Sequence, residues 1–258
     1  MQDSPGSPPT STSSDPTHSG SAPSVDSRAV QTLLVVLSVT AGSIDIISFL
    51  GLNGLFTAHI TGNLVILAAH IVVGDAAPIA PMLSVPMFIL IIILTRVLAD
   101  RLESMGLATL RPLLVLQFIL IAGFLILGVA AGARVDPNAT DAIIAGMLGV
   151  AAMAVQNALV QISLKGAPST AAMTSNVTRF AMDLGDALVG SKAAEVADAR
   201  KNAARTLPSI LGFAAGCGIG AACEARFGLR SLALPAGLAL IACVVGFVVA
   251  PAALLEKP

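Results

Sequence analysis

The stretch from Phe56 to His70, FTAHITGNLVILAAH, places polar side chains within a sequence that is otherwise apolar enough for a membrane helix. On a helix each residue turns by about 100°, so His59, Asn63 and His70 fall within about 40° of one another. One face of this helix is therefore polar. It also carries groups that titrate, which is rare for a segment surrounded by lipid.

The stretch from Ser169 to Asp183, STAAMTSNVTRFAMD, repeats this pattern at an offset of 113 residues. The apolar segments before the two stretches also match, since Asn157 aligns with Asp45 at an offset of 112. We therefore expect two related halves with a polar site between them, near the middle of the membrane. The corresponding pairs are Thr57 and Thr170, Thr61 and Thr174, Asn63 and Asn176, His70 and Asp183, and Asp45 and Asn157.

Composition places the chain among membrane proteins. Of its 258 residues, 55% are hydrophobic and 11% are charged, and the mean hydropathy is +0.88. Soluble domains carry about 25% charged residues, so a soluble fold would lack the polar surface that meets water. A net charge of −1 also provides no basic surface for nucleic acid. The expected partners are the lipid bilayer and a small solute or ion, with no nucleic acid; a homo-oligomer is left open.

Eight apolar segments follow a Ser- and Pro-rich tail, residues 1–28, which is too poor in large apolar side chains to order itself. The segments lack the sustained alternation of a membrane barrel, and most approach the ~20 residues that a spanning helix needs. The sequence predicts an all-α, polytopic transmembrane helix bundle of six to eight spans, with repeats at 29–135 and 136–258. The segments are 29–50, 55–73, 79–98, 112–132, 142–164, 167–189, 207–223 and 232–253.

The orientation in the membrane stays open at the level of sequence. If all eight segments span, seven basic residues collect on one side and six on the other, which does not decide which side is cytoplasmic. Alternatively, the second segment of each half enters the membrane and returns. Each half would then have three spans, and the two repeats would be inverted relative to each other.

The residues around the first polar stretch resemble a known family. Gly42-x-x-Asp45 and Thr61-Gly62-Asn63, with Phe56 between them, look like the signature of the YoaK-type family of bacterial membrane proteins. That family is described by a domain of unknown function, and the similarity runs from about residue 30 to about residue 250. The resemblance implies a multi-pass protein of the bacterial inner membrane and supplies no substrate. The second half departs from the signature at Ser175, which replaces the glycine.

Asp45 is the most informative single residue. An ionised carboxylate in the bilayer centre is costly unless it is paired, hydrated or protonated, so Asp45 should face the bundle interior. It can act there as a proton or cation site, or as a polar clip between helices. Asn63 and Asn176 each donate and accept hydrogen bonds, which suits a solute as well as a neighbouring helix. The predicted solute- or ion-binding residues are Asp45, Thr61, Gly62, Asn63, Asn157, Thr174 and Asn176.

Other titratable side chains in the polar stretches are candidates for gating or for a proton relay. His59 and His70 can exchange protons near neutral pH, or can lie at helix ends bonded to water and backbone. Arg179 can pair with Asp183 four residues later along a helix. Asp183 and Asp186 can equally belong to the membrane interface. The set assigned to this role is His59, His70, Arg179, Asp183 and Asp186.

We expect no catalytic, metal or cofactor site. The sequence contains no Ser/His/Asp set, zinc-binding His-Glu-x-x-His or phosphate-binding glycine loop. Cys217, Cys223 and Cys243 do not have the spacing of a zinc site or a redox pair. The predicted function is binding and alternating access by a small proton- or cation-coupled transporter. The alternative is a membrane scaffold or sensor whose polar residues only hold helices together.

Overall fold

The computed structural model describes residues 27–74, 79–130 and 138–254, and this part of the chain is helical and contains no strand. The all-α prediction is confirmed. The predicted tail lies outside the described residues up to residue 26, and the predicted repeat boundary at residue 135 lies outside them too. The helices are α1 (Ser27–Gly51), α2 (Ile60–Val73), α3 (Ile79–Ser104), α4 (Leu110–Ala130), α5 (Thr140–Ser163), α6 (Met173–Val189), α7 (Ala193–Phe227), the 3₁₀ turn η1 (Gly228–Leu232) and α8 (Ala233–Leu254).

Length and apolar composition mark five stretches as candidate membrane spans. Four of them lie in α1, α3, α4 and α5, and the fifth, Ala193–Phe247, contains both α7 and α8. The turn η1 separates these two helices and begins at Gly228, whose φ of +56° suits glycine. The described residues therefore contain six helices long enough to cross a membrane, three on each side of residue 135.

The second helix of each half is too short to cross. α2 has 14 residues and α6 has 17. At ~1.5 Å per residue these lengths are ~21 and ~26 Å, against ~30 Å of hydrocarbon. The expected segments 55–73 and 167–189 each begin with irregular chain, because helix starts only at Ile60 and Met173. By length alone, the six longer helices correspond to the lower end of the predicted range of six to eight spans.

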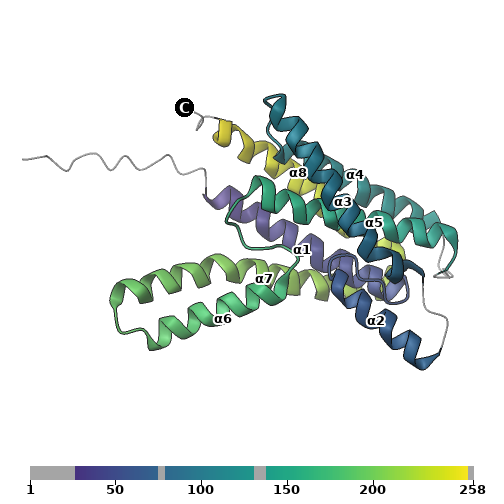
Figure 1. The fold of residues 1–258 in the computed structure, drawn as a ribbon, viewed down its shortest axis with the longest axis horizontal. Coiled ribbons are helices and arrows are strands. Elements are labelled where there is room, and N and C mark those ends of the chain that lie inside the picture. Colours follow the sequence, from purple (N-terminus) through teal and green to yellow (C-terminus); the bar gives the residue numbers. More distant parts are fainter. Residues whose placement is uncertain (1–26, 75–78, 131–137, 255–258) are drawn as a thin grey trace, which may run out of the picture.

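α7 is much longer than the apolar segment expected at 207–223. It has 35 residues and starts at Ala193. Its first turns carry many charges but are rich in alanine, which favours helix without help from apolar burial. This part of α7 packs on α6, and the two form a hairpin that extends from the bundle at the left of Figure 1.

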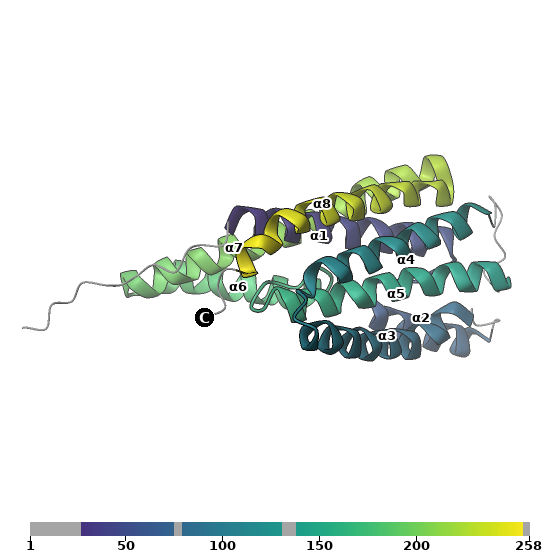
Figure 2. The same cartoon turned by 90° about the horizontal axis from the view of Figure 1, so that it is seen from above.

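The first long helix of each half packs against the second and third long helices of the other half. α1, from the first half, lies along α7 and α8 of the second, whereas α5, from the second half, lies along α3 and α4 of the first. α4 also contacts α8, and the short helices rest on their successors, α2 on α3 and α6 on α7. Figure 2 shows α4 and α5 lying between the α1–α8 side and the α2–α3 side.

A row of glycines lets α1 and α7 approach closely. Gly212, Gly216 and Gly220 recur every four residues along α7 and face α1. A methyl group added at Gly216 would collide with the α1 backbone, and one added at Gly42 would collide with the α7 backbone. Small residues of this kind hold membrane helices together, since lipid provides no hydrophobic force to associate them.

Contacts between helices determine which ends lie together. α1 and α7 run parallel, and α4 runs antiparallel to α5 and α8, with Thr109 beside Ser163 and Arg111 bonded to the carbonyl of Phe247. The end at which α1 starts, termed the N-terminal end, therefore also holds the α3–α4 connection and the ends of α5 and α8. Most described basic residues lie there: Arg28, Arg96, Arg101, Arg111, Lys165, Arg179, Lys192, Arg200, Lys201 and Arg205, against Arg226 and Arg230 at the opposite end.

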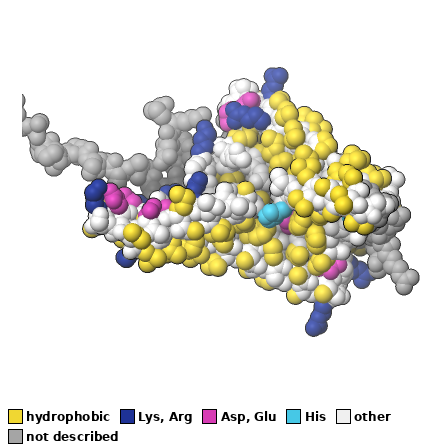
Figure 3. All heavy atoms as spheres, turned by 60° about the horizontal axis from the view of Figure 1, so that its bottom comes forward, with side chains coloured by type: hydrophobic (Ala, Val, Ile, Leu, Met, Phe, Trp, Pro, Cys, Tyr) yellow, Lys and Arg dark blue, Asp and Glu magenta, His cyan; other side chains and the backbone are white. Residues whose placement is uncertain are grey.

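The outer surface is strongly apolar. Hydrophobic side chains cover much of the face shown in Figure 3, and Lys and Arg lie mainly toward its edges. On α3, Ile89, Ile93 and Val97 are 54%, 55% and 51% exposed. Soluble monomers rarely expose apolar patches of this extent. The protein is therefore a multi-pass helical membrane protein whose outer face contacts lipid.

Candidate functional site

Asp45 is the centre of a buried polar cluster. It lies on α1 and is 3% exposed. Its Oδ1 accepts hydrogen bonds from the backbone N–H groups of Thr57, at 2.8 Å, and Ala58, at 2.7 Å. Its Oδ2 lies 2.7 Å from Nδ1 of His59. The carboxylate therefore ties α1 to the chain that leads into α2.

His59 connects this cluster to the molecular surface. Its side chain is 37% exposed, and its ring packs edge-on against Phe213 of α7 with 5.2 Å between centroids. Metal cations of the alkali and alkaline-earth groups prefer oxygen ligands, whereas Asp45 is surrounded mainly by N–H donors. This geometry favours the helix-clip interpretation of Asp45 over a cation site, and leaves proton exchange through His59 open.

The chain between α1 and α2, residues 52–59, turns back into the bundle. Leu55 and Thr57 are fully buried, and they pack where α5 has only glycine, at Gly146 and Gly149. The hydroxyl of Thr57 also lies 3.3 Å from that of Ser48 on α1. α2 consequently starts directly after a buried loop.

Asn63 holds the same loop from α2. Its Nδ2 donates to the carbonyl of Phe56 and to the hydroxyl of Ser84 on α3, both at 2.8 Å. Its Oδ1 accepts the N–H of Phe56 at 2.9 Å. Asn63 is fully buried, and its two N–H groups are used within the chain. It therefore fastens α2 to α3 and does not face an open cavity.

The loop before α6 is restrained in a related way. Asn176, 3% exposed, donates from Nδ2 to the carbonyl of Ser169 at 2.6 Å. The hydroxyl of Ser169 in turn accepts the backbone N–H of Ala172 at 2.8 Å. In this half a serine hydroxyl thus takes part of the role that the carboxylate of Asp45 has in the first half.

Gln156 is the residue of α5 that reaches the second loop. Its Nε2 donates to the hydroxyl of Thr170 at 2.9 Å and to the carbonyl of Leu37 on α1 at 3.0 Å. Asn157, the residue aligned with Asp45, instead donates to the carbonyl of Met153 within its own helix at 2.8 Å. The alignment was one residue away from the side chain that faces the loop.

Gln117 is a buried polar residue that the sequence analysis missed. Its Nε2 donates to Oε1 of Gln156 at 2.7 Å, and its own Oε1 is buried with no hydrogen-bond partner in the described chain. A lone amide in the long apolar segment 112–132 was the available signal, because polar groups within membrane spans usually face the bundle interior.

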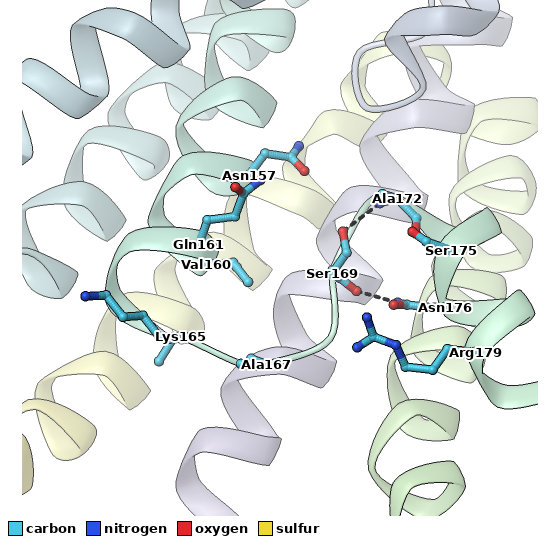
Figure 4. Close-up of a pocket in the computed structure, with 12 residues that line it drawn as sticks. Asn157, Val160, Gln161, Lys165, Ala167, Ser169, Ala172, Ser175, Asn176 and Arg179 are labelled. Carbon is cyan, nitrogen blue, oxygen red and sulfur yellow. Dashed lines mark hydrogen bonds between the residues drawn. The ribbon is translucent and has the colours of Figure 1, made fainter. Parts of the chain in front are cut away.

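A pocket of about 570 Å³ opens between the end of α5, the chain that follows it and the start of α6. Figure 4 shows Arg179 reaching from α6 toward the loop at Ser169, while the ammonium group of Lys165 lies on the α5 side and points away. The described residues that line the pocket include no acidic side chain. They are Asn157, Val160, Gln161, Leu164, Lys165, Gly166, Ala167, Ser169, Ala172, Ser175, Asn176 and Arg179.

The predicted solute-binding residues fall into two groups and not into one central site. Asp45 and Asn63 belong to the first buried cluster, and Asn157 and Asn176 line the pocket. The others lie at the starts of the short helices: Thr61 and Thr174 are exposed, and Gly62 packs against the ring of Phe56.

The gating candidates are dispersed in the same manner. His59 bonds to Asp45, and His70 lies in the last turn of α2. The pairing of Arg179 with Asp183 that their spacing allows is absent among the described ion pairs, because Arg179 turns toward the pocket. Oδ2 of Asp183 is buried without a hydrogen-bond partner in the described chain, and Asp186 is exposed.

Among the described residues, no group of three or more His, Cys, Asp or Glu side chains is placed to hold a metal ion.

Comparison with other proteins identifies a family but no activity. No curated protein and no solved structure matches the chain. A family model described as "Protein of unknown function (DUF1275)" matches residues 33–245. This match confirms the resemblance seen in the sequence: the chain belongs to the DUF1275 family of proteins of unknown function.

Proposed function

We propose that the protein is a secondary transporter that moves a small solute by alternating access. The observation that carries the proposal is the pair of short helices, α2 and α6, each preceded by a buried loop that an asparagine fastens in the same way. Irregular backbone inside a membrane is tolerated where it is buried in protein or lines a cavity. Interrupted helices at matching places in two halves are typical of transporter binding sites.

The packing of each half's first helix on the other half supports two halves that are inverted relative to each other. α1 contacts α7 and α8, and α5 contacts α3 and α4, so the first helix of each half has the same kind of neighbours. With three spans in each half, the second half would have the opposite direction in the membrane. The loops at Thr57 and Thr170 would then enter from opposite faces. Rocking of one such half against the other is a common route to alternating access.

The distribution of charge supports an orientation. The N-terminal end of the bundle collects most of the described basic residues, and Arg226 and Arg230 lie at the opposite end. Under the positive-inside rule the N-terminal end faces the cytoplasm. If α2 and α6 also crossed the membrane, this bias would disappear, because each extra crossing exchanges the sides of all later loops. We place the protein in a bacterial inner membrane on the strength of the family resemblance.

The Asp45–His59 pair is our candidate for proton coupling. The carboxylate is buried, and its partner is a half-exposed imidazole 2.7 Å away. A proton arriving at His59 would alter the bond that holds the first loop. Cys217, on α7, is a further titratable group near this carboxylate. Transport would involve binding and movement of groups and no bond making.

The test is flux in proteoliposomes. The purified protein is reconstituted and presented with a panel of organic anions, amino acids, sugars, polyamines and inorganic ions, with and without a pH gradient. Current or tracer uptake above protein-free liposomes supports transport. Loss of that flux in a folded Asp45→Asn variant supports a role for the pair. Folded protein that moves nothing across the panel contradicts the proposal.

A scaffold or sensor is the second candidate, and the bonding of Asn63 favours it. This side chain is fully buried and bonds to Phe56 and Ser84 through both its Oδ1 and its Nδ2, which is how a purely structural amide behaves. Under this alternative, Asp45→Asn and Asn63→Leu lower thermal stability in detergent and change no solute flux.

A further inference from the structure

We infer that the pocket between α5 and α6 binds a small organic anion. The inference deepens the proposed transport function by naming its substrate class, and it rests on that function for the pocket's role. The pocket opens at the N-terminal end of the bundle, beside the end of α5. Its position therefore makes it accessible from the side that we assign to the cytoplasm.

The charge of the lining carries the argument. Arg179 and Lys165 line the pocket, with the ammonium group of Lys165 pointing away from it, and no acidic residue lines it among those described. Neither cation has an ion-pair or hydrogen-bond partner in the described part of the chain. Asp183, one turn from Arg179, does not pair with it in the structure. A guanidinium in this setting is free to form the two-pronged bond that carboxylates accept.

The start of α6 adds donors to the same wall. Ser175 and Asn176 line the pocket in the first turn of the helix. N–H groups in a first turn have no acceptor within the helix and carry partial positive charge. Ala172, the residue before α6, provides no side-chain cap for them. The start of α6 and the guanidinium of Arg179 therefore both favour a negatively charged ligand.

The size and the remaining lining indicate an organic anion larger than chloride. The pocket measures about 570 Å³, in the range that holds metabolite-sized ligands. Asn157 and Gln161 present amide groups, and Val160 and Leu164 add an apolar wall. A carboxylate at Arg179 with a short carbon skeleton against α5 would use both kinds of surface.

The experiment uses an introduced tryptophan. Because the chain contains no Trp and no Tyr, Ala172→Trp places a single reporter at the pocket edge, on an exposed residue. The full-length variant in nanodiscs of neutral lipid is titrated with acetate, succinate, citrate, benzoate, phosphate and sulfate. Choline, putrescine and glycerol serve as cationic and neutral comparisons. Saturable fluorescence change with an organic anion, and none with the comparisons, is the expected result.

Variants that change the charge of single residues test whether the anion binds at Arg179. In the reporter background, Arg179→Gln should weaken the binding of the responding anion by about 10- to 100-fold, the value of one charge-assisted hydrogen-bonded pair. Arg179→Lys should restore part of it. Lys165→Gln should weaken it less, since this ammonium points away from the pocket. Arg226→Gln, at the opposite end of the bundle, is the matched control and should leave the affinity unchanged.

Several outcomes would overturn the inference. One is an absence of response to every anion by folded protein; another is an equal response from the Arg179→Gln variant. Free anions and lipid headgroups are separated by repeating the titration in nanodiscs with anionic lipid. If no soluble anion changes the fluorescence, and anionic lipid alone changes it in a manner that depends on Arg179, the pocket is a headgroup site and the inference is wrong.

Binding and transport can fail separately. Arg179-dependent binding without flux in proteoliposomes would leave the anion site standing and count against the transporter. Flux of a cation or neutral solute without anion binding would keep the transporter and overturn the anion site.

Discussion

Asn63 and Asn176 make the same hydrogen bond in the two halves of the chain. Each donates from Nδ2 to the backbone carbonyl of the residue seven positions earlier, Phe56 at 2.8 Å and Ser169 at 2.6 Å. The bond closes the loop that precedes a short helix, so the position of α2 and of α6 depends on one buried amide each.

The two asparagines should differ in how much stability they provide. Asn63→Leu removes three hydrogen bonds and leaves the backbone N–H and C=O of Phe56 without these partners, at about 1–3 kcal/mol for each unsatisfied group, whereas the Ser84 hydroxyl still donates to the carbonyl of Pro81. Asn176→Leu removes the single backbone bond and should cost less. Thermal unfolding followed with a thiol-reactive dye suits this chain, because its cysteines are free. Thr61→Val, at an exposed site beside Asn63, is the control; equal melting temperatures for all three variants would contradict the assignment.

The row of glycines on α7 that faces α1 should not tolerate an added methyl group. Gly216→Ala would drive a side chain into the α1 backbone, and overpacking of this kind costs about 1–3 kcal/mol. Gly218→Ala is the matched control, since nothing lies within 4 Å of its added Cβ. Alanine there should raise stability slightly, because glycine inside a helix is unfavourable by up to about 1 kcal/mol. A Gly216→Ala protein with the same melting temperature as the Gly218→Ala protein would contradict the close approach of the α1 and α7 backbones at Gly216.

The carboxylate of Asp45 should be replaceable in part by an amide. Asp45→Asn keeps an Oδ1 for the N–H groups of Thr57 and Ala58 and loses the charged bond to His59. Asp45→Ala loses both and strands two N–H groups, at about 1–3 kcal/mol each. We expect the melting temperature to fall in the order wild type, Asp45→Asn, Asp45→Ala. Equal melting temperatures for the two variants, both well below wild type, would mean that the charged bond to His59, and not the loop amides, dominates.

The membrane class and most of the helices follow from the sequence because apolar length is a local property. The beginnings of α2 and α6 do not. Residues 55–59 are as compatible with helix as those after them, and they are irregular because Asp45 takes up their backbone N–H groups. The sequence marks Asp45 as unusual. Its partners are backbone N–H groups, which do not depend on residue type, so the sequence does not reveal which of them the carboxylate binds.

Helix phase explains why Gln156, and not Asn157, meets the second loop. Asn157 and Gln156 are adjacent, and neighbouring residues on a helix point about 100° apart. An alignment by residue type chose Asn157, whereas the side chain that meets Thr170 and Leu37 is Gln156. Only the packing of α5 against α1 and α4 determines which amide faces inward.

The six-span topology predicts that the α3–α4 connection and the α7–α8 connection lie on opposite sides of the membrane. Met105, 71% exposed, marks the first connection, and Phe227, 62% exposed, marks the second. Each is changed to cysteine in a chain that lacks the native cysteines, and is labelled with a membrane-impermeant maleimide in spheroplasts and in inverted vesicles.

Met105→Cys should react only in inverted vesicles and Phe227→Cys only in spheroplasts, because the basic N-terminal end is assigned to the cytoplasm. Exchange of the two results would reverse the orientation and keep six spans. Labelling of both cysteines from one and the same side would require α6 to cross the bilayer, because α6 is the short helix between the two connections and one added crossing changes their relative side. In that case α6 would be a membrane span, and the interrupted-helix argument for transport would lose its basis.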